Sequence, residues 1–254
     1  MTKRATKRRE ADVLKLVATN QAAINEGPRK KTFSVHDMHP IEPLTDNQEA
    51  AFELFDIQPD CGIFLEGCPG TGKTFIALYN GLKLVLDKNT PYKKLVIIRS
   101  TVPTRDMGFL KGTEEEKIAA YERPYHSLFD HIFKYKKSYD NMKEAGLIEF
   151  ESTAFLRGTT FDDCIVILDE AQNVSFNEGM TVASRIGTNS KFIMCGDTHQ
   201  SDFKKDTDKS ETEKFFKLIR SMPSVDSIKF HVDDIVRSGW CRELIETQIK
   251  LGFY

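Results

Sequence analysis

Residues 62–74 read Gly-Ile-Phe-Leu-Glu-Gly-Cys-Pro-Gly-Thr-Gly-Lys-Thr, and this stretch decides the fold of the 254-residue chain. Its first five residues form a short, largely apolar run, which predicts a buried β-strand. Residues 67–74 match the pattern G-x-x-x-x-G-K followed by Ser or Thr. From Phe75 to Leu86, apolar residues recur at helical spacing. A strand, a glycine-rich loop and a helix in this order predict a phosphate-binding loop.

The residue types of this loop suit a nucleoside triphosphate. Its glycines let successive amide hydrogens turn inward toward phosphate oxygens, and the following helix adds its positive end. Lys73 supplies a charge for the β- and γ-phosphates, and the Thr74 hydroxyl is placed to ligate Mg²⁺. We therefore expect nucleotide contacts from Gly67, Pro69, Gly70, Thr71, Gly72, Lys73 and Thr74.

An acidic pair follows another apolar run, residues 165–168. Asp169 stands at the carboxyl end of the predicted strand, where it would complete the Mg²⁺ shell. Glu170 would polarise the attacking water as general base. Given the phosphate-binding loop, this pair predicts the catalytic edge of the sheet.

Four apolar runs, at 62–66, 95–98, 164–168 and 191–195, are nearly continuous rather than alternating. Such strands are buried on both faces, as in a parallel sheet covered by helices. Residues 147–150 and 225–230 are weaker strand candidates. We predict an α/β fold with one mainly parallel sheet of five or six strands and helices on both faces. This domain is assigned to residues 44–254, and residues 1–43 to a basic appendage, partly helical or disordered.

The composition, 40% apolar and 29% charged with a net charge of −2, is that of an ordinary globular protein. No run approaches the roughly 18 apolar residues that cross a bilayer, so no membrane partner is expected. No apolar segment of a secretory signal follows the basic amino terminus, and the five cysteines include no C-x-x-C pair. We therefore expect reduced cysteines and a cytoplasmic protein.

Three further motifs resemble those of helicases. Asp169-Glu-Ala-Gln172 and Gly196-Asp-Thr-His-Gln200 resemble the second and third motifs of superfamily-one helicases. That resemblance implies that Gln200 senses the γ-phosphate. Leu44-Thr-Asp-Asn-Gln48 looks like the adenine-reading Q motif, because a Gln amide can both donate to and accept from the adenine edge.

Across residues 44–250 the order of motifs resembles the PhoH-like ATPase family. The resemblance implies a RecA-like domain that binds ATP and Mg²⁺ and hydrolyses ATP. It departs at Lys111, where the family pattern has proline. The other matching segments are Gly108-Phe-Leu-Lys-Gly112, Ala154-Phe-Leu-Arg-Gly-Thr-Thr-Phe161, Ser184-Arg-Ile-Gly187 and Asp233-Asp-Ile-Val-Arg-Ser238.

Arg237 lies in a segment that resembles the helicase arginine motif. In two-lobed helicases that arginine comes from the second lobe, and 254 residues hold only one lobe. We therefore hypothesise that Arg237 acts catalytically on the nucleotide of a neighbouring subunit, in a homo-oligomer such as a hexameric ring. The alternative is an arginine in a surface or structural salt bridge.

Residues 121–143 mix aromatic and basic side chains, a composition that suits single-stranded nucleic acid. The aromatic spacing is also that of an amphipathic helix packed on the domain. We favour packing for Phe129, Ile132 and Phe133. Lys134, Lys136 and Lys137 remain candidate contacts to a nucleic-acid backbone.

Two functions share the phosphate-binding loop, so the loop cannot separate them. The first is an ATP-hydrolysing enzyme, an oligomeric motor that acts on RNA or single-stranded DNA. The alternative is a nucleotide-dependent switch or assembly factor that has a protein partner and no coupling to nucleic acid.

Overall fold

The computed structural model describes residues 32–56, 62–100, 114–156, 158–197 and 206–253. The chain divides into two compact units, Met1–Thr32 and Phe33–Tyr254, and the fold described below is that of the second. Among the described residues, no helix is long and apolar enough to cross a membrane.

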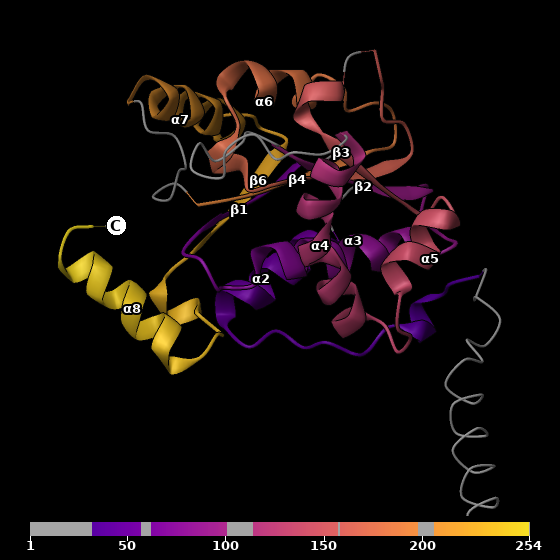
Figure 1. The fold of residues 1–254 in the computed structure, drawn as a ribbon, viewed down its shortest axis with the longest axis horizontal. Helices are drawn as coiled ribbons and strands as arrows, with labels where there is room; N and C mark the ends of the chain where they lie inside the picture. The colour runs from indigo at the N-terminus through magenta and orange to yellow at the C-terminus, as the bar shows by residue number, and fades with distance from the viewer. Residues whose placement is uncertain (1–31, 57–61, 101–113, 157, 198–205, 254) are drawn as a thin grey trace, which may run out of the picture. The chain divides into compact units, whose positions relative to one another are not determined.

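A six-stranded sheet forms the centre of the domain (Figure 1). Its strands are β1 (Gly62–Gly67), β2 (Lys94–Arg99), β3 (Ile148–Ser152), β4 (Cys164–Asp169), β5 (Lys191–Gly196) and β6 (Val225–Phe230). They lie in the order β3-β2-β4-β5-β1-β6, and every neighbouring pair is parallel. The predicted α/β fold is therefore confirmed, and the two weaker strand candidates form the edges of the sheet.

Side chains of the central strands alternate between two apolar clusters, one on each face of the sheet. Along β1, Ile63 and Leu65 enter the first cluster and Phe64 enters the second. Strands β2 and β4 alternate in the same way. This double burial explains why the central runs are continuously apolar, since neither face of these strands meets water.

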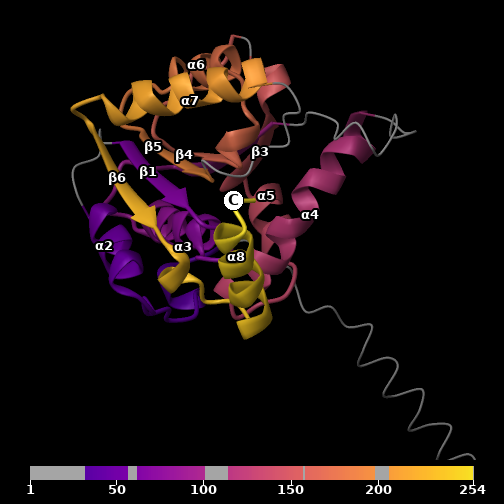
Figure 2. The same ribbon diagram turned by 90° about the vertical axis from the view of Figure 1, so that its left-hand side faces the viewer.

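Helices cover both faces, as predicted, and Figures 1 and 2 show them as two layers. Helices α2 (Asp46–Leu54), α3 (Lys73–Leu86), α4 (Glu114–Ile132) and α5 (Ser138–Glu144) contribute to the first cluster. Helices α6 (Phe176–Ala183) and α7 (Asp206–Arg220) contribute to the second. The last helix, α8 (Gly239–Lys250), packs Ile245 beside Cys68 of the loop after β1. The 3-10 helices are η1 (Val35–Asp37), η3 (Thr153–Phe155), η4 (Ala171–Asn173) and η5 (Val232–Asp234).

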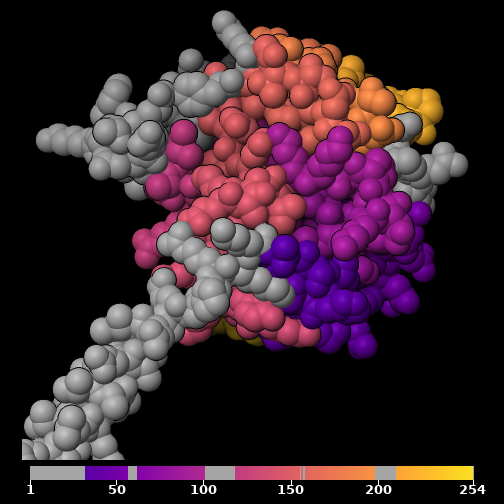
Figure 3. All heavy atoms as spheres, turned by 90° about the vertical axis from the view of Figure 1, so that its right-hand side faces the viewer, coloured from indigo at the N-terminus to yellow at the C-terminus, as the bar shows by residue number. Residues whose placement is uncertain are grey.

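Residues 33–43, which we assigned to the appendage, pack on the domain instead. Met38 is buried and pairs with Phe133 in an antiparallel bridge, and the His39 amide donates to the Ile132 carbonyl at 2.7 Å. Figure 3 shows the start of the described chain, in indigo, on the surface of this unit. The compact unit therefore begins at Phe33 and not at residue 44, because this segment adds apolar side chains to the first cluster.

The predicted amphipathic helix over residues 121–143 is split between α4 and α5. Lys137 precedes α5 with a φ of 58°, a left-handed conformation that separates the two helices. Phe129, Ile132 and Phe133 are buried, as expected from their spacing. The Lys134 Nζ donates to the His36 carbonyl at 2.9 Å, so this candidate lysine already has a partner within the chain.

Candidate functional site

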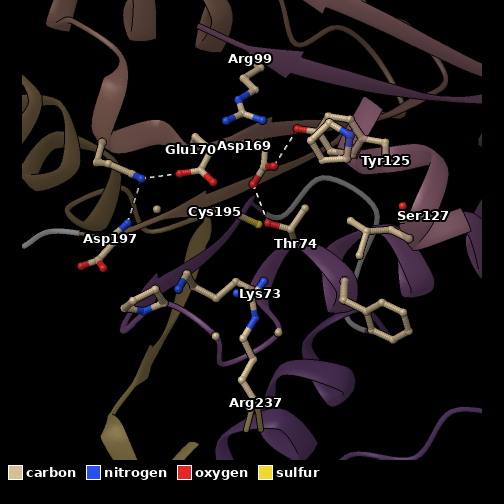
Figure 4. A pocket seen from close by; sticks show the side chains of 18 of the residues that line it. Lys73, Thr74, Arg99, Tyr125, Ser127, Asp169, Glu170, Cys195, Asp197 and Arg237 are labelled. Carbon is tan, nitrogen blue, oxygen red and sulfur yellow. Dashed lines mark hydrogen bonds between the residues drawn. The ribbon is translucent and has the colours of Figure 1, made fainter. Parts of the chain in front are cut away.

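A cleft of about 640 Å³ lies at the edge of the sheet where the parallel strands end. Its lining comes from the loop after β1, from Arg99 at the end of β2, from the ends of β4 and β5, and from α4. In the close-up view, Asp169 and Glu170 lie between Arg99 and Lys73 (Figure 4). Parallel strands thus bring together residues that are distant in sequence.

Three glycines give the phosphate loop its curvature. Gly67, Gly70 and Gly72 have φ angles of 125°, 79° and 88°, which residues with a side chain rarely adopt. A Cβ on Gly67 would lie 2.0 Å from the Phe230 carbonyl oxygen, so this position has no room for a side chain. Gly72 precedes α3, so the positive end of that helix is at the cleft.

Lys73 folds over the loop. Its Nζ donates to the carbonyl oxygens of Gly67 and Cys68, both at 2.7 Å. Burial lowers the pKa of Lys73, whereas the negative charges of Asp197 and Glu170 act to raise it. A cation beside a curved, glycine-rich loop is the arrangement that binds a polyphosphate.

The side chains of Thr74 and Asp169 meet in the cleft. The Thr74 Oγ1 donates to Asp169 Oδ1 at 2.7 Å, and the Tyr125 hydroxyl donates to Asp169 Oδ2, also at 2.7 Å. Hydroxyl and carboxylate oxygens are the ligands that Mg²⁺ prefers, so this pair could hold the ion of a metal–nucleotide complex. In the described part of the chain, no group of three or more His, Cys, Asp or Glu side chains could hold a metal ion.

Glu170 lies next to this pair, and the Gln172 side chain holds its carboxylate by a hydrogen bond. The Gln172 Nε2 donates to Glu170 Oε2, and the Gln172 Oε1 accepts from the Asp197 amide at 3.0 Å. Burial raises the pKa of Glu170 and Asp169 raises it further, whereas Arg99 lowers it. A carboxylate with a raised pKa at a cleft wall is suited to accept a proton.

Gln48 lies behind the phosphate loop. It is buried, its Nε2 donates to the Thr71 carbonyl at 3.0 Å, and its Oε1 accepts from the Leu44 amide at 2.8 Å. The amide nitrogen thus connects α2 to the loop, and the amide oxygen binds the segment just before α2. The role of Gln48 in reading adenine stays a prediction. Thr71 is fully buried, whereas Pro69 lines the cleft.

Arg237 lies in the cleft of its own chain. The Val236 amide donates to the Gly70 carbonyl at 3.2 Å. A Cβ on Gly70 would lie 3.3 Å from Arg237 Cδ, so the arginine stem packs against the loop. Arg237 thus lies beside the loop of its own chain, and its action on the nucleotide of a neighbouring subunit stays a prediction.

Two residues of the site were missed at the sequence level. Arg99 pairs in register with Asp169 on the neighbouring strand, and its guanidinium lies 5.8 Å from the centre of the Tyr121 ring. Its signal was available, because Arg99 directly follows the apolar run 95–98 just as Asp169 follows its own run. Tyr125 carried no such signal, since an aromatic residue at helical spacing predicts packing. Gln200 lies outside the described residues, as does the segment Gly108–Gly112.

A parallel sheet with a glycine-rich loop between β1 and α3, and an acidic pair at the end of β4, defines a P-loop nucleotide-binding domain. The family model described as PhoH-like protein matches residues 40–248. The chain belongs to this family, as its motifs predicted.

Three relatives illustrate the similarity. Protein PhoH2 of Bacillus subtilis is 34% identical over 178 residues, which cover 68% of this chain and 40% of the relative. A PhoH-like protein of the same organism is 32% identical, with 74% of this chain and 58% of the relative covered. Protein PhoH of Escherichia coli is 30% identical, with 82% and 58% covered. The chain thus spans about half the length of the curated relatives it matches.

Solved structures with lower sequence identity are also similar. The large terminase of a thermophilic bacteriophage, in complex with ADP, has a TM-score of 0.48 and 13% identity, over 80% of this chain and 50% of that one. The Hef helicase domain of Pyrococcus furiosus has a TM-score of 0.39 and 11% identity, over 74% and 38%.

Proposed function

We propose that this chain binds ATP with Mg²⁺ and hydrolyses the bond between its β- and γ-phosphates. The observation that carries the proposal is the meeting of three parts in one cleft: the glycine-rich loop, the Thr74–Asp169 pair and Glu170. Each part follows a predicted strand or begins a helix, so the fold itself brings them together. The preference for ATP rests on the resemblance of the Gln48 segment to the Q motif.

The donor set of the cleft fits the metal–nucleotide complex. The loop amides and Lys73 would bind the β- and γ-phosphates, and Thr74 and Asp169 supply hard oxygen ligands close together. Mg²⁺, when bound, supplies positive charge at the β- and γ-phosphate oxygens. Burial of Asp169, which is 4% exposed, keeps this carboxylate fixed in place.

Glu170 carries the chemical step. It takes a proton from water while the water oxygen bonds to the γ-phosphorus. The bond from that phosphorus to the bridging oxygen breaks, and ADP and phosphate leave. Arg237 would face the developing charge from the loop side, where a cation is typically worth about 10³–10⁵ in rate.

We further propose a cytoplasmic homo-oligomer, such as a hexameric ring, that acts on RNA or single-stranded DNA. The support is the resemblance of the segments ending in Gln172 and Gln200 to helicase motifs, together with two exposed lysines, Lys136 and Lys137, beside α5. The second candidate is a nucleotide-dependent switch with a protein partner. It is favoured by α8, where Trp240 is 76% exposed and Leu244 50% exposed, since exposed apolar side chains suit a protein surface.

The test compares ATP turnover with and without single-stranded RNA or DNA, in wild type and in Lys73→Ala. We expect turnover that single strands stimulate several-fold and that Lys73→Ala abolishes. Turnover that single strands leave unchanged, with no salt-dependent binding to them, supports the switch instead. Absence of any turnover in the wild type contradicts the ATPase proposal. The mass in solution, with and without ATP, tests assembly in the same samples.

A further inference from the structure

Helix α4 supplies the second partner of Asp169, and this partner does not belong to the phosphate loop. The Tyr125 hydroxyl donates to Asp169 Oδ2 at 2.7 Å, while Thr74 occupies Oδ1 at the same distance. Thr74 lies in the first turn of α3, directly after the loop. Tyr125 is anchored separately, from a helix that begins after β2.

The surroundings of Tyr125 fix its position. Its side chain is 1% exposed, and its ring packs against Phe150 of β3 with centroids 5.7 Å apart. A phenol hydroxyl carries its proton at neutral pH, so it acts here as the donor to the Asp169 carboxylate.

We propose that Tyr125 is a positioning residue that holds the Asp169 carboxylate in the orientation needed for the metal–nucleotide complex. The inference rests on the proposed function, because it assigns Asp169 to the metal. Side chains that hydrogen-bond a ligating carboxylate are known to set metal affinity, and their loss typically costs about 10–100-fold. Tyr125 has the geometry of such a partner: buried, rigid and directed at the oxygen that Thr74 leaves free.

The chain offers a matched control in Tyr139. This tyrosine is also 1% exposed, and its hydroxyl also donates to a carboxylate, Glu122 Oε1, at 3.1 Å. Glu122 pairs with Lys143 and is not among the residues that line the cleft. Tyr125→Phe and Tyr139→Phe thus remove the same group from comparable surroundings, but only the first removes it from the cleft.

The experiment titrates Mg²⁺ while the affinity for a fluorescent ADP analogue is measured, with EDTA at the metal-free limit. For Tyr125→Phe we expect unchanged affinity in EDTA and a Mg²⁺ midpoint raised about 10–100-fold. For Tyr139→Phe we expect the wild-type midpoint. Thermal unfolding of both variants reports any common loss of stability.

If Tyr125→Phe is less stable than the wild type, a double variant separates a loss of stability from a loss of carboxylate positioning. In an Asp169→Asn background there is no carboxylate left to orient, so adding Tyr125→Phe should not change the Mg²⁺ response further. An equal Mg²⁺ midpoint for Tyr125→Phe and wild type overturns the role of Tyr125 and leaves the proposed function standing. The same holds if Tyr125→Phe weakens the Mg²⁺ response as much in the Asp169→Asn background as in the wild type. A wild-type chain that binds no nucleotide overturns the proposed function as well.

Discussion

Thr74 Oγ1 and Asp169 Oδ1 lie 2.7 Å apart although 95 positions separate the two residues in the chain. The hydrogen bond joins the first turn of α3 to the end of β4. It therefore connects the helix that follows the phosphate loop to the carboxylate that we assign, together with Thr74, to the metal. Loss of the Thr74 hydroxyl should weaken the response to Mg²⁺ and leave phosphate binding by the loop.

Thr74→Val removes that hydroxyl and keeps the shape of the side chain. We expect nucleotide binding in EDTA to persist, because the loop amides and Lys73 are unchanged. Binding should gain much less from Mg²⁺, and turnover should fall by about 10–100-fold or more, as for loss of a group that supports a metal. Thr74→Ser restores the hydroxyl and should restore both properties. A valine variant with the wild-type Mg²⁺ response would refute the assignment of Thr74.

Gly67 lies where the loop passes β6 most closely. Both Gly67 and Gly146 have positive φ, 125° and 71°, but a Cβ on Gly146 meets nothing within 4 Å. Gly146→Ala should therefore cost only the conformational strain, about 1–2 kcal/mol. Gly67→Ala adds a clash with a backbone carbonyl that cannot rotate away, and should cost about 1–3 kcal/mol more. Urea unfolding of the two variants measures the difference, and equal losses would show that the loop shifts freely.

Arg237 packs on the loop of its own chain, and mixing two inactive variants tests whether it acts there or on a neighbouring subunit. Arg237→Ala should lower turnover, and so should Glu170→Gln. If Arg237 acts within its chain, mixing these two variants restores nothing, because neither chain holds a complete cleft. Recovery of turnover on mixing would show that the arginine is supplied by a neighbouring subunit. Arg242→Ala, which alters an arginine bonded to Asp233 and Ile235 carbonyls, is the control.

The site residues that we predicted from the sequence lie in contiguous motifs. The loop 67–74, Asp169 and Glu170 each follow a strand whose apolar run is visible in the sequence, and parallel topology places such ends at one edge. Arg99 carries the same signal, because it directly follows the apolar run 95–98. Tyr125 could not be assigned in this way, since its role depends on how α4 packs, which no local pattern contains.

The same limit explains the difference between prediction and structure at residues 33–43. We assigned them to a basic appendage, yet the buried Met38 pairs with Phe133 of the domain. The contact between the Arg237 stem and Gly70 likewise depends on how the chain returns after β6, which the sequence motif does not describe.

The measurement that tests the central claim most directly is phosphate release by Glu170→Gln, with ATP binding measured in the same samples. Glu149→Gln, which changes a glutamate paired with Lys94 outside the cleft, is the control. We predict that Glu170→Gln binds ATP as the wild type does and releases phosphate about 10²–10⁴-fold more slowly, the usual contribution of a general base. Phosphate release at the wild-type rate would contradict the account.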